Sequence, residues 1–473
     1  MILFGLFGLL ALACIFFTVR KKGCRSFILA LYALVFIFTL WASVYYAKAD
    51  PGASPDENAH ISYIYYVKAT GEIIPHFEEM GLFTDYTVFD SDSIYMYRDD
   101  MVNYLCHPPL YYQIMRLAGG FINTQDAGFV GIDKMHLRYF SLGIFALGLA
   151  LIFYIGYSCL DKNKPWIHFF YAIAASSIPM LTFEGCAVTN DNLALVTGAL
   201  ATLGLLRYCK GRRDYLTYIL IASGITASLL TKMTAAMLVI FMAGIILLYT
   251  IFKEKSIAKA LTKEFWITCP IYFIALAYFA IIYSRYGVIQ VSLQMICSQE
   301  YFESTIYYTP VSQRQAMTLG QYIAYYLQEF FLSWSGIEAS NRYTKLTCFN
   351  KASLPLELLW LFPGFALVPG LFKKVKSLSL PIIAGWISCL VTFFIQLKSA
   401  YGTFLTRGYR GGFQSRYYLP LLFVFALGTA YLLQSLDNKK STAPVRYLSC
   451  ALALIYAFLL FYANVPFFMI HFA

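Results

Sequence analysis

The sequence predicts an all-α polytopic membrane protein that forms a single integral membrane domain over residues 1–473. Of its 473 residues, 59% are hydrophobic and only 13% are charged, so the chain lacks the polar side chains that a water-facing surface requires. Apolar runs of the roughly 20 residues needed to cross a bilayer recur along the whole chain. The intervals between them leave room for no soluble domain longer than about 90 residues.

Twelve apolar runs predict the membrane spans, with ends defined to about 2–4 residues. The run at the N-terminus has no basic residue ahead of it and a basic cluster behind it, so we interpret it as a retained helix with its N-terminus outside. The predicted spans are 1–19, 27–47, 138–159, 166–183, 191–208, 215–231, 233–252, 265–284, 353–371, 379–397, 417–435 and 447–470.

The charges of the connectors assign the two sides of the membrane. Six short connectors are basic, among them RKKGCR at 20–25 and CKGRRD at 209–214, and basic connectors mark the cytoplasmic face. The net charge of +11 is therefore a sign of topology and does not indicate a nucleic-acid partner. The longer connectors of mixed charge lie outside, the longest being an outer loop at 48–137 and a second at 285–352.

The second outer loop contains a stretch, QAMTLGQYIAYYLQEFFLSWS at 315–335, that could be read as a thirteenth span. Gln321, Gln328 and Glu329 favour an amphipathic helix lying in the membrane interface. If the stretch does span, every later segment changes side. The 11 cysteines show no metal-binding spacing, and a disulfide among Cys106, Cys186, Cys297 and Cys348, all in outer loops, stays open.

Charged residues within the predicted spans are confined almost entirely to their outer ends. They include Glu184, Asp191, Lys232, Glu357 and Arg416. A proton-coupled transporter would place ionisable residues near the middle of the membrane. The pattern instead predicts a catalytic or binding cavity at the outer membrane–water boundary.

The first outer loop opens with two adjacent carboxylates and a histidine, in PDENAH at 55–60. Asp56 or Glu57 could accept a proton from an attacking hydroxyl or bind a divalent ion such as Mg²⁺ or Mn²⁺, and Asp50 and His60 are further candidates nearby. The alternative is helix capping, with Ser54 or Asp56 as N-cap and Glu57 favoured in the first turn by the helix dipole. Both interpretations can hold together.

Several basic residues lie outside, where the positive-inside rule would not place them. They are Lys232 in LLTKMTA, and Arg410 and Arg416 in TRGYRGGFQSRYYLP. A phosphate is the natural partner for such residues. His107 in HPPLYY, and Asn190 and Asp191 in VTNDNLALVTG, are also candidates, although each stretch alone is an ordinary start of a helix.

In this order, PDENAH with GEIIPHF, HPPLYY, NDNLAL, LTK and QSRYYLP resemble the GT-C superfamily of membrane glycosyltransferases. The pattern is similar to the DUF2142 type of bacterial membrane proteins, related to the protein O-mannosyltransferase and aminoarabinose transferase families, and it extends from about residue 44 to 435. The resemblance implies a GT-C-like bundle of about 12 helices, whose long first outer loop carries short amphipathic helices. It also implies Asp56 as catalytic base, with Glu57 as alternative base or metal partner. Lys232, Arg416, His107 and Arg410 would then bind the donor phosphate. The span at 1–19 is a departure from the family pattern.

The resemblance implies transfer of a sugar, with inversion, from a polyprenyl-phosphate donor to a glycan, lipid or protein acceptor. The enzyme would be a multi-pass protein of the cytoplasmic membrane with its site on the outer side. A polysaccharide ligase or polymerase, and a flippase or permease for lipid-linked sugars, remain alternatives. A flippase needs phosphate-binding cations but no carboxylate base, so the acidic pair distinguishes the two classes.

Overall fold

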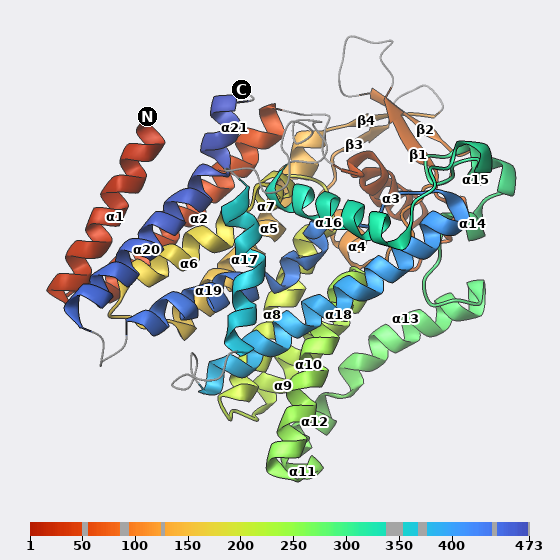
Figure 1. The fold of residues 1–473 in the computed structure, drawn as a ribbon. Coiled ribbons are helices and arrows are strands. Elements are labelled where there is room, and N and C mark those ends of the chain that lie inside the picture. The colour runs from red at the N-terminus through yellow and green to blue at the C-terminus, as the bar shows by residue number, and fades with distance from the viewer. Residues whose placement is uncertain are drawn as a thin grey trace.

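The computed structural model describes residues 1–49, 55–85, 94–123, 128–336, 353–367, 376–437 and 442–471, and its long helices form one bundle (Figure 1). Eight helices within these ranges are long and apolar enough to cross a membrane, which confirms the predicted polytopic, largely helical architecture. They are α1 (Ile2–Arg20), α2 (Cys24–Ala49), α5 (Lys134–Cys159), α8 (Asp191–Cys209), α10 (Met233–Glu254), α18 (Lys376–Arg407), η5 with α19 (Ser415–Leu421 and Leu422–Leu436) and α20 (Ala443–Tyr462).

The other four predicted spans are shorter or interrupted helices. The interruptions coincide with prolines, because proline lacks a backbone N–H and readily starts a new helix. In the predicted span 166–183, for example, Ile178 is extended and Pro179 opens the next helix. These segments are α6 (Pro165–Ser176) with α7 (Pro179–Glu184), α9 (Tyr215–Leu229), α12 (Lys263–Thr268) with α13 (Pro270–Tyr286), and α17 (Leu354–Leu361) with η4 (Phe362–Leu367). Two short helices, α11 (Ile257–Ala260) and α21 (Val465–His471), complete the bundle.

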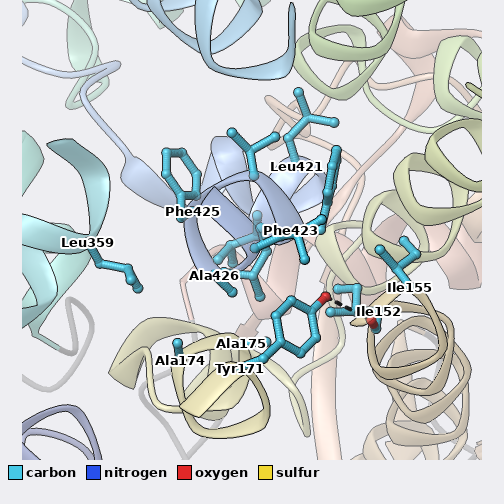
Figure 2. Packing of buried hydrophobic residues seen from close by; sticks show 14 of the residues in the cluster. Ile152, Ile155, Tyr171, Ala174, Ala175, Leu359, Leu421, Phe423, Phe425 and Ala426 are labelled. Carbon is cyan, nitrogen blue, oxygen red and sulfur yellow. Dashed lines mark hydrogen bonds between the residues drawn. The ribbon is translucent and has the colours of Figure 1, made fainter. Parts of the chain in front are cut away.

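The centre of the bundle is formed by α6 and α19. Every residue of α6 is buried, and α6 packs against α1, α2, α19 and α20. Figure 2 shows Phe425 and Ala426 of α19 together with Tyr171 of α6, whose hydroxyl donates to the carbonyl of Ile152 at 2.8 Å. In contrast, only Phe7 and Cys14 are buried in α1, as expected for a peripheral helix that faces lipid.

The first loop segment, 48–137, contains a small sheet in addition to helices. The helices are α3 (Glu57–Thr70), η1 (Phe77–Glu79) and α4 (Leu110–Met115). The strands β1 (Leu82–Asp85), β2 (Ile94–Arg98), β3 (Phe121–Asn123) and β4 (Phe129–Ile132) form an antiparallel sheet in the order β1-β2-β4-β3, with Phe83 opposite Tyr97. The all-α prediction therefore missed a sheet, since strands of three to five residues show too few alternations to be recognised in a sequence.

The described part of the second loop segment, residues 285–336, lies at the same end of the bundle as the sheet (Figure 1), which we call the loop-side end. It contains α14 (Leu293–Ile296), α15 (Gln299–Ser304), η2 (Val311–Gln313) and α16 (Leu319–Ser335). Tyr322, Tyr326 and Phe330, spaced four residues apart, form the buried face of α16, so its predicted amphipathic character is correct. That α16 lies in the interface and does not span is still a prediction. Cys106, Cys186 and Cys297 are free thiols, and Cys348 lies outside the described residues.

Candidate functional site

Five charged side chains from distant parts of the chain meet at the loop-side end of the bundle. Asp56 immediately precedes α3, Glu184 ends α7, Asp191 begins α8, Lys232 precedes α10, and Arg416 lies in η5. Because α7 ends where α8 and α10 begin, the fold brings these positions to one level. We call the five residues the ionic cluster.

Arg416 is the centre of the ionic cluster. Its Nη2 lies 2.9 Å from Oδ2 of Asp56, and its Nη1 lies 2.9 Å from Oε1 of Glu184. Its Nε lies 3.6 Å from Oδ2 of Asp191. The Arg416 side chain is only 5% exposed, so these carboxylates provide the compensation that a buried guanidinium requires.

Lys232 is held by Asp191 and by an aromatic ring. Its Nζ lies 2.6 Å from Oδ1 of Asp191 and 4.6 Å from the centre of the Tyr417 ring. The N-terminus of α10 carries a partial positive charge, which disfavours a cation there, whereas Asp191 is favoured at the N-terminus of α8. The Asp191 carboxylate therefore stabilises the charge of Lys232, whereas the dipole of α10 disfavours it.

Asp56 is the most exposed carboxylate of the cluster and has an unusual backbone. Its side chain is 33% exposed, and the Tyr104 hydroxyl donates to its Oδ1 at 2.7 Å. Burial alone would raise the pKa of Asp56, but Arg416 and the Tyr104 hydroxyl outweigh burial and hold the pKa at about 2. Its φ of 60° lies in the left-handed region, where aspartate and asparagine are tolerated better than most residues. Asp56 is the N-cap of α3, as predicted, but its side chain makes no capping hydrogen bond.

Glu57 points to a different arginine. Nε of Arg138 donates to Oε1 of Glu57 at 2.8 Å, Nη2 of Arg138 pairs with Oε2, and the amide of Val188 also donates to Oε1. Both partners of the ion pair are buried, so Glu57 fastens the start of α3 to α5. Asp56 and Glu57 thus lie in different ion pairs, with Arg416 and Arg138 respectively, and their predicted role as a shared metal site stays a prediction. No group of three His, Cys, Asp or Glu suited to a metal occurs within the described ranges.

The two histidines predicted for the site, His60 and His107, lie with their rings stacked, the centroids being 6.3 Å apart. Nδ1 of His60 is 3.0 Å from the Tyr112 hydroxyl. Burial and His107 lower the pKa of His60 to about 3, and burial and Lys232 lower the pKa of His107 to about 4. Burial thus favours the neutral form of both rings, and a neutral His107 can still donate a hydrogen bond to a phosphate.

The remaining predicted residues take other places. Asn190 is buried beside Asp191, and its Nδ2 donates to the carbonyl of Thr231 at 3.2 Å. Arg410 is exposed, donates to Oε1 of Gln315 at 2.8 Å and is not part of the ionic cluster. Asp50 lies outside the described residues.

Sequence reasoning missed four residues of the site and its support. Glu184 was noted as a carboxylate at the end of a span, but not as a partner of Arg416. Arg138 could have been suspected, since like Lys232 it is a basic residue at the outer end of a predicted span. Tyr104 and Tyr417 carry no signal that distinguishes them among 39 tyrosines.

Comparison with known proteins finds no matching family model and no matching curated protein. Two solved structures are similar to this chain. ArnT from Cupriavidus metallidurans bound to undecaprenyl phosphate is 12% identical, with a TM-score of 0.48 over 90% of this chain and 62% of ArnT. The oligosaccharyltransferase of Archaeoglobus fulgidus in the apo form is 14% identical, with a TM-score of 0.40 over 91% of this chain and 55% of that protein.

The chain thus spans less than two thirds of the length of either protein. Similarity this distant does not carry a substrate or an activity from one protein to another.

Proposed function

We propose that this protein is a GT-C-type glycosyltransferase that moves a sugar from a polyprenyl-phosphate donor to an acceptor on the outer side of the membrane. The ionic cluster is the observation that carries the proposal. It places a partly exposed carboxylate, Asp56, in direct contact with a cation, Arg416, at one end of an apolar bundle. A phosphate at the level of the lipid headgroups can leave readily only if positive charge is already in place there.

The cluster contains more negative than positive groups, which determines how a donor can enter. Arg416 and Lys232 are both already paired with carboxylates. The side chain of Asp56 is 33% exposed, compared with 2% for Glu184 and 4% for Asp191. An arriving phosphate would therefore compete with Asp56 for Arg416, while the buried acids keep the two cations in position.

This exchange would also activate Asp56. With a pKa of about 2, Asp56 is a poor base at neutral pH as long as Arg416 pairs with it. When the donor phosphate takes Arg416, the pKa of Asp56 rises toward its ordinary range because an opposite charge is removed. The carboxylate would become a competent base only with the donor bound.

The proposed reaction is a single displacement. The acceptor oxygen forms a bond to the anomeric carbon as the bond from that carbon to the phosphate oxygen breaks. The phosphate leaves with the electron pair and is stabilised by Arg416 and Lys232, while Asp56 takes the proton of the acceptor hydroxyl. Glu57 and Arg138 act as positioning residues, since their ion pair fixes the residue that follows Asp56.

Replacement of Asp56 by asparagine tests the proposal directly. Asparagine tolerates the left-handed backbone as well as aspartate does, so Asp56→Asn should fold and bind the donor. It should lose transfer by about 10²–10⁴-fold, the usual contribution of a general base. The measurement is transfer of radiolabel from a panel of prenyl-phosphate sugars by the purified protein in membranes.

The matched control is Asp99→Asn, the same change at an exposed residue of the same loop segment, which should leave transfer unchanged. Near-normal turnover by Asp56→Asn would remove Asp56 as the base. If the wild-type protein transfers no sugar from any donor but moves lipid-linked sugars across the membrane, this result would refute the transferase and support the permease.

A further inference from the structure

A cavity separate from the ionic cluster lies between the second loop segment and the C-terminal end of α18. It has a volume of about 560 Å³ and is lined by residues of α14, α15 and the end of α18. Its walls include Gln299, Phe302, Tyr308, Arg314, Thr406 and Arg407. We call it the arginine cleft.

Neither arginine of this cleft meets a carboxylate among the residues that the structure describes, and Nε of Arg314 donates to the carbonyl of Thr309 at 2.8 Å. Among the ion pairs within the described part of the chain, Arg416, Arg138, Arg207 and Arg213 each meet a carboxylate, whereas Arg314 and Arg407 do not. The guanidinium of Arg407 lies 5.2 Å from the centre of the Phe302 ring, and that of Arg314 lies 5.3 Å from the Tyr308 ring. Two positive charges at one cavity repel each other, and an anion bound between them would offset this repulsion.

The two acidic residues of α15 do not line the cleft. Glu300 and Glu303 are exposed, and Oε1 of Glu303 accepts a hydrogen bond from Gln299 at 2.6 Å. The Thr406 hydroxyl donates to the carbonyl of Gly402 at 2.9 Å. The side-chain oxygens of Gln299 and Thr406 in the wall can accept hydrogen bonds from hydroxyl groups of a ligand. The cleft thus combines two guanidinium groups, aromatic rings and uncharged hydrogen-bonding side chains.

A short segment links the arginine cleft to the proposed catalytic carboxylate. The Tyr307 ring packs at a tilt of 53° against the Tyr104 ring, with centroids 5.3 Å apart, and Tyr104 donates to Asp56. The next residue, Tyr308, lines the cleft, and the amide of Thr309 donates to the carbonyl of Arg407 at 2.8 Å. The same three-residue segment therefore contacts both sites.

We propose that the arginine cleft binds the acceptor through an anionic sugar, one that bears a carboxylate or a phosphate. The inference rests on the proposed function only in calling the ligand the acceptor. Guanidinium groups bind carboxylates and phosphates in two-pronged geometry, and the neutral polar side chains suit sugar hydroxyls. A phospholipid headgroup offers a related anion, so the experiment must separate a glycan from a lipid.

The test uses the full chain in nanodiscs of zwitterionic lipid, with binding followed by saturation-transfer NMR. The probe is tetragalacturonate, a carboxylate-bearing tetrasaccharide, and its neutral counterpart is maltotetraose. The charged sugar should bind in a salt-sensitive manner, and the neutral sugar should not. Arg314→Gln and Arg407→Gln should each weaken binding by about tenfold or more, because each removes a charged hydrogen-bond donor.

The matched control is Arg285→Gln, the same change at an exposed arginine at the end of α13, which should bind the probe normally. Equal binding of both sugars, or unaltered binding by both cleft variants, would overturn the inference. So would retention of phosphatidylglycerol that depends on Arg314 and Arg407 without binding of tetragalacturonate, since this assigns the cleft to lipid.

Failure of the proposed function gives a different result. Asp56→Asn leaves the cleft intact and should bind tetragalacturonate like the wild type. Arginine-dependent binding of this sugar by a protein that transfers nothing would leave the cleft as a glycan site and refute only the transferase.

Discussion

Lys232 and Asp191 allow a structural role of a buried cation to be separated from a role in donor binding. Their side chains are 7% and 4% exposed, so Lys232→Gln alone leaves a buried carboxylate short of a partner and should destabilise the fold by about 3–5 kcal/mol. The double variant Lys232→Gln/Asp191→Asn removes both charges and should recover most of this stability. Thermal unfolding of the two single variants and the double variant measures the coupling.

Donor affinity should behave differently in the same variants. If Lys232 binds the phosphate, the double variant should still bind the donor about ten- to a hundredfold more weakly, the range for a lost charged hydrogen bond. Recovery of both stability and affinity in the double variant would show that Lys232 serves only as the partner of Asp191.

The lowered pKa of Asp56 predicts a pH dependence of stability. A carboxyl group whose pKa is lower in the folded state stabilises the fold at pH values above its unfolded pKa, and this contribution is lost as pH falls. With a folded pKa of about 2 against an ordinary value of 3.8, the loss should occur between about pH 4 and pH 2. Asp56→Asn should flatten this part of the unfolding curve, whereas Asp99→Asn should not. An identical acid profile in both variants would contradict the Arg416–Asp56 pair.

At the residue scale, the sequence identified several residues of the site but not the ion pairs that they form. Lys232 and Arg416 stood out because they violate the positive-inside rule, and the structure places both against Asp191. Pairing across 41 and 225 residues depends on tertiary packing, for which one sequence has no local signal. Glu57 could not be separated from Asp56 by sequence, because only the fold shows that it faces Arg138.

Among the elements, the contact of α8 with η5 holds Arg416 in place. A Cβ at Gly198 of α8 would lie 2.5 Å from the carbonyl oxygen of Pro420 in η5, a separation that backbone atoms cannot accept. Gly198→Ala should therefore displace η5, and a shift of about 1 Å at a catalytic group can cost about a hundredfold in rate. Transfer activity of the folded variant is the measurement.

Gly143→Ala in α5 is the control, because nothing lies within 4 Å of a Cβ at that position. It should leave transfer unchanged, since alanine is also the better helix former. Full activity of Gly198→Ala would show that η5 adapts and that its close contact with α8 is not needed to position Arg416.

The elements also show where periodicity is a sufficient guide and where it is not. Eight of the predicted apolar runs contain a helix long and apolar enough to cross a membrane, because a helix in lipid satisfies its own backbone hydrogen bonds. The break at Pro179 is equally a local property. The four short strands of the first loop segment owe their pairing to partners elsewhere in that segment, and the sequence did not predict them.

For the whole molecule, cysteine labelling tests which loops face each side of the membrane. Single cysteines at Asp99 and Ser312, both exposed in the loop segments, should react with an impermeant maleimide in intact cells. Cysteines at Arg212 and Lys259, exposed at the opposite basic connectors, should react only after permeabilisation. The background should be a chain whose reactive native cysteines are replaced. Labelling of Asp99 and Ser312 from opposite sides would refute the predicted topology, and labelling of both only from inside would reverse it.

The length of α18 determines how far from the lipid the arginine cleft lies. The helix has 32 residues, which at about 1.5 Å each gives about 48 Å, whereas the hydrocarbon layer is about 30 Å thick. Even tilted by about 40°, the helix would still project over about 37 Å. Its terminal residue, Arg407, should therefore lie outside the hydrocarbon layer. The length of α18 would then set the distance from the membrane at which an acceptor sugar is bound. A lipid whose only sugar adjoins the membrane would be too short to reach Arg407, and the protein should favour acceptors whose charged sugar lies farther out on the chain.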